Sequence, residues 1–262
     1  MDFIEYIILG IIQGITEFLP ISSSGHLLIG RFIFGMDSHI SGSFIEIFLH
    51  GGTLLSILLY WKKDLIEDAK KIINGKSSIF INIIIGTLPA AVIGLLFKNQ
   101  IDEYFFNIEN INYLAISYLF LSIILFLTKS NSLNRYENIS YKYAFIIGIA
   151  QCFAIIPGIS RAGITIAAAL YIGMDSKNST KFSFMLAIPI LFVSFFGSLI
   201  ENYSLFTQSV IFWPLIAGFI SSFFVGYLTI KFLVNIIKKD KLWYFSAYCL
   251  SLSFILIYYN GI

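Results

Sequence analysis

Charge is scarce in this sequence. Asp, Glu, Lys and Arg together make up 12% of the 262 residues, whereas soluble domains carry roughly 25%. Hydrophobic residues reach 58%, so water cannot be the main solvent of the folded chain. The net charge of +2 is too small to indicate a basic nucleic-acid-binding surface, and we expect no nucleic-acid partner.

Cysteine is also rare. Cys152 and Cys249 both lie inside apolar segments, which excludes a disulfide framework and a metal site built from Cys and His. Residues 1–5 contain neither a basic region nor a cleavage motif of small residues. We therefore expect no cleaved signal peptide.

Long uncharged apolar runs are what the sequence does have. A helix needs roughly 20 such residues to cross the hydrocarbon of a membrane. Runs without Asp, Glu, Lys or Arg cover 77–97, 110–128, 182–200, 202–230 and 242–262. The sequence therefore predicts an all-α integral membrane protein in which 1–262 form a single membrane domain.

Two broken, re-entrant helical hairpins and six transmembrane helices are predicted along the chain. The hairpins cover 3–35 and 143–173. The spans cover 44–61, 79–97, 111–128, 182–200, 211–230 and 243–260. Because each hairpin is followed by three spans, the chain divides into two similar repeats, 1–128 and 139–262.

A weak residue-by-residue match supports these repeats. A shift of 138 residues superimposes Ile21 and Ser22 on Ile159 and Ser160, and Gly25 on Gly163. A shift of 132 superimposes Gly86 on Gly218 and Gly94 on Gly226. An odd number of spans in each repeat inverts the second copy relative to the first, so we expect an inverted-topology repeat.

The distribution of positive charge agrees with that inversion. Fourteen of the 17 Lys and Arg residues lie in the connections 62–78, 129–142, 174–181 and 231–242. Such basic connections are typically cytoplasmic. With this orientation the two hairpins enter from opposite faces and meet near the midplane, where inverted-repeat proteins place their binding sites.

The first break, 13–26, gathers rare polar groups. Glu17 and His26 flank three consecutive serines: Ser22, Ser23 and Ser24. An ionisable group at membrane depth costs about 3 kcal/mol, which makes the stretch a candidate functional site. A serine, a histidine and a glutamate can act as nucleophile, proton carrier and carboxylate. Alternatively, Gln13 and Glu17, which share a helix face, could hold a divalent cation.

The second break, 156–163, contains an isolated arginine. The forked guanidinium of Arg161 suits a phosphate group. Gly158 and Gly163 let the backbone approach a ligand closely, and Ser160 can cap the following half-helix. Two half-helix N-termini, an arginine and several hydroxyls together predict a cradle for a phosphate or diphosphate.

Each of these residues also has a purely structural interpretation. Glu17 and Arg161 could neutralise each other as a buried ion pair, the serines could only cap a helix, and His26 could be a structural histidine. Glu46 and His50 lie one turn apart at the outer end of the first span. We expect them to be polar groups of the membrane interface rather than ligands.

The two breaks resemble the signature motifs of the bacterial undecaprenyl-diphosphatase family, also called the bacitracin resistance protein family. The resemblance covers essentially the whole chain. The family's (Glu/Gln)-x-x-x-Glu element matches Gln13 and Glu17, and its Pro-x-Ser-Ser-x-Gly-His element matches Pro20, Ser22, Ser23, Gly25 and His26. Its Pro-Gly-x-Ser-Arg-Ser-Gly element matches Pro157, Gly158, Ser160, Arg161 and Gly163, with Ala162 replacing a serine.

The resemblance implies an enzyme of the bacterial cell membrane. It would hydrolyse undecaprenyl diphosphate to undecaprenyl phosphate and inorganic phosphate, recycling the lipid carrier of cell-wall synthesis, and its overproduction would confer bacitracin resistance. The active site would open to the outer face and use Mg²⁺ or Ca²⁺. The expected partners are membrane lipid and the polyprenyl diphosphate substrate, with a homodimer as an open option.

Three routes of hydrolysis stay open. Ser23 is the first candidate nucleophile, with Glu17 or His26 taking its proton; water activated by Glu17 is second, and His26 as nucleophile is third. We expect Arg161 to stabilise the charge of the transferring phosphate. The expected substrate-binding residues are Gln13, Ser22, Ser24, Gly158, Ser160 and Gly163. The competing function is a polyprenyl-phosphate flippase or an anion transporter, because discontinuous helices in inverted repeats are typical of transporters.

Overall fold

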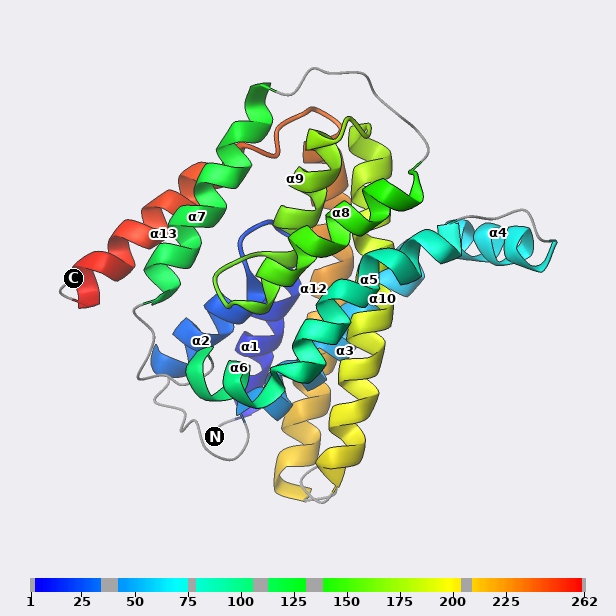
Figure 1. Ribbon diagram of the computed structural model, residues 1–262. Coiled ribbons are helices and arrows are strands. Elements are labelled where there is room, and N and C mark those ends of the chain that lie inside the picture. The colour runs from blue at the N-terminus through cyan, green and yellow to red at the C-terminus, as the bar shows by residue number, and fades with distance from the viewer. Residues whose placement is uncertain are drawn as a thin grey trace.

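The computed structural model describes residues 3–33, 42–74, 79–105, 113–130, 139–203 and 209–260, and in these ranges every regular element is a helix (Figure 1). The first half contains α1 (Phe3–Thr16), α2 (Ser23–Ile33), α3 (Gly42–Tyr60), α4 (Lys62–Ile73), α5 (Ile79–Leu96), α6 (Lys98–Phe105), α7 (Tyr113–Leu127) and η2 (Thr128–Ser130). The second contains α8 (Tyr141–Cys152), η3 (Phe153–Ile155), α9 (Arg161–Tyr171), α10 (Ser176–Glu201), α12 (Ser209–Ile237) and α13 (Tyr244–Asn260).

Several of these helices are long and apolar enough to cross a membrane. Three described segments meet both criteria, Ile79–Leu96, Ser176–Glu201 and Phe212–Ile237, and the bent pair of α3 and α4 provides up to one more. Apolar side chains cover the outside: Leu95 is 75% exposed and Ile116 is 72% exposed. Such exposure is unfavourable in water and favourable in lipid, so the chain is a multi-pass helical membrane protein.

The predicted spans 111–128 and 243–260 correspond to α7 and α13, which are apolar but shorter than a full crossing. The set of six spans therefore stays a prediction. The predicted connection 62–78 differs from the structure, because its first part is the helix α4. Its apolar residues recur at helical spacing between charged ones, and Lys181 of α10 pairs with Asp64 and Asp68 at 2.9 and 3.2 Å.

At both predicted hairpins the chain forms two helices with a break at the expected place, and residues 34 and 35 of the first hairpin lie outside the described residues. In the first, α1 ends at Thr16 and α2 begins at Ser23, with Pro20 between them. Ser22 adopts a φ of +67°, in the left-handed region, which turns the chain into α2. In the second, Gly158 has a φ of +91° between η3 and α9, a conformation that glycine adopts without strain.

Close glycine contacts pair each half of the chain with the other. A Cβ atom added to Gly10 of α1 would lie 2.2 Å from the carbonyl oxygen of Gly218 in α12. A Cβ atom added to Gly148 of α8 would lie 2.6 Å from the carbonyl oxygen of Gly86 in α5. The shift of 138 equates Gly10 with Gly148, and the shift of 132 equates Gly86 with Gly218, so the two contacts correspond. Small residues at such positions let membrane helices approach closely.

The two breaks touch each other inside the bundle. The Gly158 N–H donates to Ser22 Oγ at 3.0 Å, and Ser160 Oγ donates to the Leu19 carbonyl at 3.4 Å. Ser22 and Ser160 are 2% exposed. Residues more than 130 positions apart in the sequence therefore share one small buried volume.

Candidate functional site

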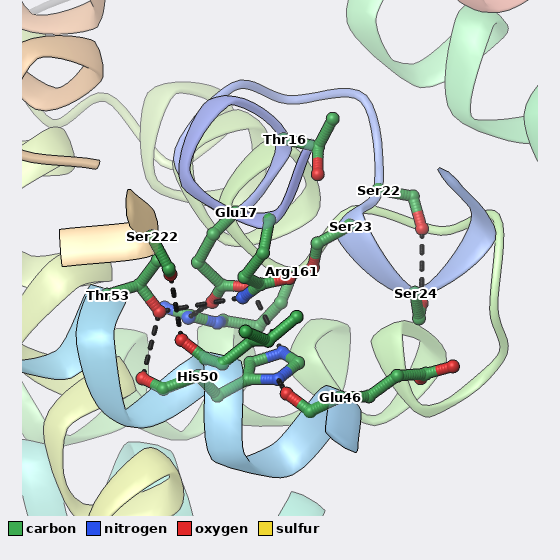
Figure 2. A network of polar contacts seen from close by, with 12 residues as sticks. Thr16, Glu17, Ser22, Ser23, Ser24, Glu46, His50, Thr53, Arg161 and Ser222 are labelled. Atoms are coloured by element: carbon green, nitrogen blue, oxygen red, sulfur yellow. Dashed lines mark hydrogen bonds and ion pairs between the residues drawn. The ribbon is translucent and has the colours of Figure 1, made fainter. Parts of the chain in front are cut away.

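Glu17 is the centre of the site. It follows the last residue of α1, is 7% exposed, and receives hydrogen bonds on both carboxylate oxygens (Figure 2). Oε1 accepts from Arg161 Nη2 at 2.5 Å. Oε2 accepts from Ser23 Oγ at 2.7 Å and from Gln13 Nε2 at 3.1 Å. The structure thus brings together four of the predicted site residues, from both hairpins.

Arg161 is the first residue of α9, and only part of its guanidinium is used. Nη2 pairs with Glu17, whereas Nη1 is buried without a hydrogen-bond partner among the described residues. A buried cationic donor that lacks an acceptor is costly. A phosphate oxygen is the acceptor that this fork suits best.

His50 is the site residue that the sequence analysis missed. It was expected at the membrane interface, but its Nε2 atom lies 3.2 Å from Glu17 Oε2. Thr53, one turn later on α3, accepts from Gln13 Nε2 at 3.5 Å and donates to the His50 carbonyl at 2.9 Å. The available signal was the presence of rare polar residues in an apolar span, but sequence does not tell which way that helix faces.

Glu46 is also buried within the protein. It forms a buried ion pair with Arg31 of α2, with Arg31 Nη1 2.9 Å from Glu46 Oε1 and side chains 3% and 5% exposed. This pair lies one turn of α3 from His50, and its opposite charges offset each other.

His26 lies apart from the hydrogen-bonded group around Glu17. Its Nδ1 atom is 2.7 Å from the Ser22 carbonyl and 3.0 Å from Tyr118 Oη, and its Nε2 atom is 2.7 Å from Tyr248 Oη. The ring also stacks on Tyr248, with centroids 5.7 Å apart. Both ring nitrogens are therefore engaged, and the described contacts do not join His26 to Ser23.

The remaining predicted binding residues build the two breaks. Ser22 Oγ accepts from Gly25 N–H at 3.4 Å, and Ser160 Oγ accepts from Gly163 N–H at 3.1 Å, so each caps a half-helix. Ser24 Oγ lies 3.3 Å from Ser22 Oγ (Figure 2).

Gln13 and Glu17 do not form a cage for a divalent cation in this arrangement. Mg²⁺ and Ca²⁺ take about six or more oxygen ligands. Gln13 turns its amide nitrogen to Glu17 and offers only Oε1, which is buried without a partner among the described residues. Arg161 already neutralises the carboxylate at 2.5 Å. Within the described ranges, His, Cys, Asp and Glu side chains form no group of three suited to a metal. We therefore derive no catalytic step from a metal held by these residues.

A family of known proteins matches nearly the whole chain. The family model described as "Bacitracin resistance protein BacA" covers residues 6–255. The chain belongs to the bacitracin resistance protein family.

Relatives of this bacitracin resistance family member match along nearly their full length. Undecaprenyl-diphosphatase 4 of Bacillus thuringiensis (strain Al Hakam) is 39% identical over 261 residues, covering 98% of this chain and 97% of the relative. Undecaprenyl-diphosphatase 4 of Bacillus cereus is 38% identical with the same coverage. Undecaprenyl-diphosphatase of Christiangramia forsetii is 37% identical over 254 residues, covering 95% of both chains.

Proposed function

We propose that this protein hydrolyses undecaprenyl diphosphate to undecaprenyl phosphate and inorganic phosphate. The observation that carries the proposal is the pairing of Glu17 with both Ser23 and Arg161, while one guanidinium nitrogen keeps a buried, unused donor. Phosphoryl transfer requires a nucleophile, a base and a cation that binds the phosphate, and a hydroxyl beside a carboxylate with a partly unused guanidinium provides all three. The relatives' names agree with this activity rather than with transport.

The geometry favours Ser23 as the nucleophile. Its hydroxyl donates to Glu17 Oε2 at 2.7 Å, so Glu17 is placed to take the proton as Oγ attacks the terminal phosphorus. The bond from phosphorus to the bridging oxygen breaks, and undecaprenyl phosphate leaves. Water then attacks the phosphorus of the phosphoserine, and the bond from phosphorus to Ser23 Oγ breaks. Oγ takes back the proton held by Glu17, and inorganic phosphate leaves with the oxygen and the hydrogens of the water. Arg161 Nη1 binds the transferring group throughout.

Two other routes are less well supported by the contacts. Water activated by Glu17 requires no new geometry and stays the second route. Attack by His26 would require the ring to leave Tyr118 and Tyr248, which hold its two nitrogens at 3.0 and 2.7 Å. The role of His26 in the proposal is therefore to hold the start of α2 in place.

We propose that the site lies between two inverted repeats and opens to the outer face of the plasma membrane. The corresponding glycine contacts, Gly10 with Gly218 and Gly148 with Gly86, support the repeat. The basic connections, being typical of the cytoplasmic side, support the orientation. Through this activity the protein would recycle the lipid carrier of peptidoglycan synthesis and, when overproduced, confer bacitracin resistance.

We propose that the substrate's first isoprene units occupy an apolar cavity beside the second break. The cavity has a volume of about 380 Å³ and is lined mainly by Ile93, Phe97, Ile101, Phe105, Ile155 and Ile156. Its wall ends next to Pro157 and Gly158, whose N–H reaches Ser22. Filling it with Ile155→Trp should raise KM for the C55 substrate and leave KM for a short-chain diphosphate unchanged.

Phosphate release by the purified protein tests the activity. The protein in detergent micelles should convert undecaprenyl diphosphate into equal amounts of inorganic phosphate and undecaprenyl phosphate, and Arg161→Ala should release almost none. Addition of Mg²⁺, Ca²⁺ or a chelator in the same assay tests the expected metal dependence. If wild-type protein releases no more phosphate than Arg161→Ala, while transferring polyprenyl phosphate across liposomes, the transporter alternative replaces the proposal.

A further inference from the structure

Both ring nitrogens of His50 face oxygen atoms. Nδ1 lies 2.6 Å from the backbone carbonyl oxygen of Glu46, and Nε2 lies 3.2 Å from Glu17 Oε2. A neutral imidazole carries one N–H and one lone pair, so it can satisfy only one such contact. A carbonyl oxygen supplies no proton, which means that Nδ1 is the donor to Glu46.

The second contact then needs a proton of its own. With Nδ1 protonated, a neutral ring would turn the Nε2 lone pair toward the Glu17 carboxylate. That carboxylate is already bound to Ser23 Oγ and Gln13 Nε2 on the same oxygen, both of which donate to it. An ionised Glu17 is therefore consistent with every neighbour, provided that Nε2 also donates.

We propose that His50 is an imidazolium that ion-pairs with Glu17, holds the carboxylate in register with Ser23, and adds a second cation to the phosphate-binding site. His50 contacts Glu17 but no reacting atom, so it is a positioning residue. Its hydrogen bond on Oε2 complements that of Arg161 on Oε1, which fixes the plane of the carboxylate. The His50 side chain is only 19% exposed.

The charged groups around His50 are consistent with a protonated ring. Glu46, on α3 with His50, is neutralised by Arg31 of α2. Glu17, which follows α1, is neutralised by Arg161 of α9. From α12, Ser222 donates to the carbonyl of Leu49, next to His50, and contributes no charge. The described charged groups of the cluster thus balance without His50, and an imidazolium gives the cluster a net positive charge. That sign favours a diphosphate anion.

Replacing His50 tests this assignment, which rests on the proposed function only for its kinetic readout. His50→Gln keeps an N–H donor without charge or titration, whereas His50→Leu removes the donor. We expect His50→Leu to lower kcat/KM about 100-fold and His50→Gln about 10-fold or less. In the wild type, kcat/KM should fall as pH rises and the imidazolium loses its proton. His50→Gln should lack that fall. Ser56 lies on the same helix and donates to the Phe223 carbonyl, so Ser56→Ala is the matched control. This variant should keep the fall of kcat/KM at high pH.

Nitrogen NMR of histidine-labelled protein in micelles provides a readout independent of turnover. The signals that disappear in His50→Gln should show both ring nitrogens protonated at neutral pH. A ring protonated only at Nδ1, an unchanged alkaline fall in His50→Gln, or wild-type kcat/KM in His50→Leu would each overturn the assignment. If His50→Leu fails to fold, the first two results still decide. Phosphate release by the wild type would stand in every case, so failure here is distinct from failure of the phosphatase proposal.

Discussion

The two breaks use one backbone device for two different tasks. In both, a serine hydroxyl caps the second half-helix through the N–H of a glycine three residues later, Gly25 for Ser22 and Gly163 for Ser160. Each of these serines also reaches across to the other break. The backbone frame is thus shared, while the charged side chains are not: Glu17 belongs to the first break and Arg161 to the second.

The two equivalent glutamines show the same division. Gln13 and Gln151 are related by the shift of 138 residues, and both are buried. Gln13 donates to the Glu17 carboxylate at 3.1 Å, whereas Gln151 donates to the Gly86 carbonyl at 3.2 Å, at the contact of α8 with α5. In the proposed repeat, the glutamine of the first copy thus lies at the candidate site and that of the second lies at a contact between two helices.

Loss of the cation in the second break should have the largest effect. Arg161→Ala removes the proposed donor to the transferring phosphate and breaks the ion pair with Glu17. We expect kcat/KM to fall about 10⁴-fold in a phosphate-release assay. Arg161→Lys, which keeps the charge but not the fork, should recover part of it. Lys177→Ala, at the start of α10, is the control with one surface cation removed. Full activity in Arg161→Ala would refute the cradle.

Loss of the hydroxyl in the first break comes next. Ser23→Ala should lower kcat about 10³-fold, because the substrate still binds and water can attack slowly. A quenched-flow experiment with labelled diphosphate should trap a phosphorylated wild-type protein and none in the variant. Ser253→Ala, a buried serine of α13 that donates to the Ala115 carbonyl, should keep its activity. Near-normal turnover by Ser23→Ala would remove the serine route in favour of water.

The two glutamines offer a direct test of the division between the breaks. Gln13→Leu removes a hydrogen bond to a charged group, worth about 1.5 kcal/mol, so kcat/KM should fall roughly tenfold. Gln151→Leu should leave kcat/KM unchanged and lower thermal stability in detergent, because it disturbs the α5–α8 contact. If both variants lose activity to the same extent, the two breaks are not specialised as described.

The smallest expected effect is on stability. Ser160→Ala removes the cap of α9 and its bond to Leu19, which should cost about 1 kcal/mol of unfolding free energy. Thermal unfolding in detergent should shift downward by a few degrees, while Ser160→Thr should restore most of the loss. No shift in Ser160→Ala would show that the caps do not hold the breaks.

Much of the architecture could be predicted because polar residues are so rare in this chain. The two breaks followed from where polar residues and proline interrupt apolar sequence, and their meeting followed from the distribution of positive charge among the connections. The ion pair between Glu17 and Arg161 had been considered only as the purely structural interpretation. The helix α4 did not, because a run rich in lysine was interpreted as a connection. The amphipathic spacing of these residues predicts a helix, and it should have been weighed above the lysine content.

The side chains of the site were less predictable. His50 was misplaced because hydropathy does not determine the rotation of a span about its own axis, and α3 turns His50 inward to Glu17. Either Glu17 or His26 was expected to take the proton of Ser23. The left-handed Ser22 instead starts α2 so that Ser23 reaches Glu17 while His26 lies between two tyrosines. Such orientations depend on the packed structure rather than on local pattern.

The ion pair between Glu17 and Arg161 joins residues 144 positions apart. During synthesis, Arg161 is therefore made well after Glu17, and until then His50 of α3 is the charged partner that the first half of the chain offers the carboxylate. The proposed catalytic centre is complete only when the second half of the chain supplies Arg161. A chain that ends before Arg161 would lack this cation, so activity would report that the second half of the chain is in place.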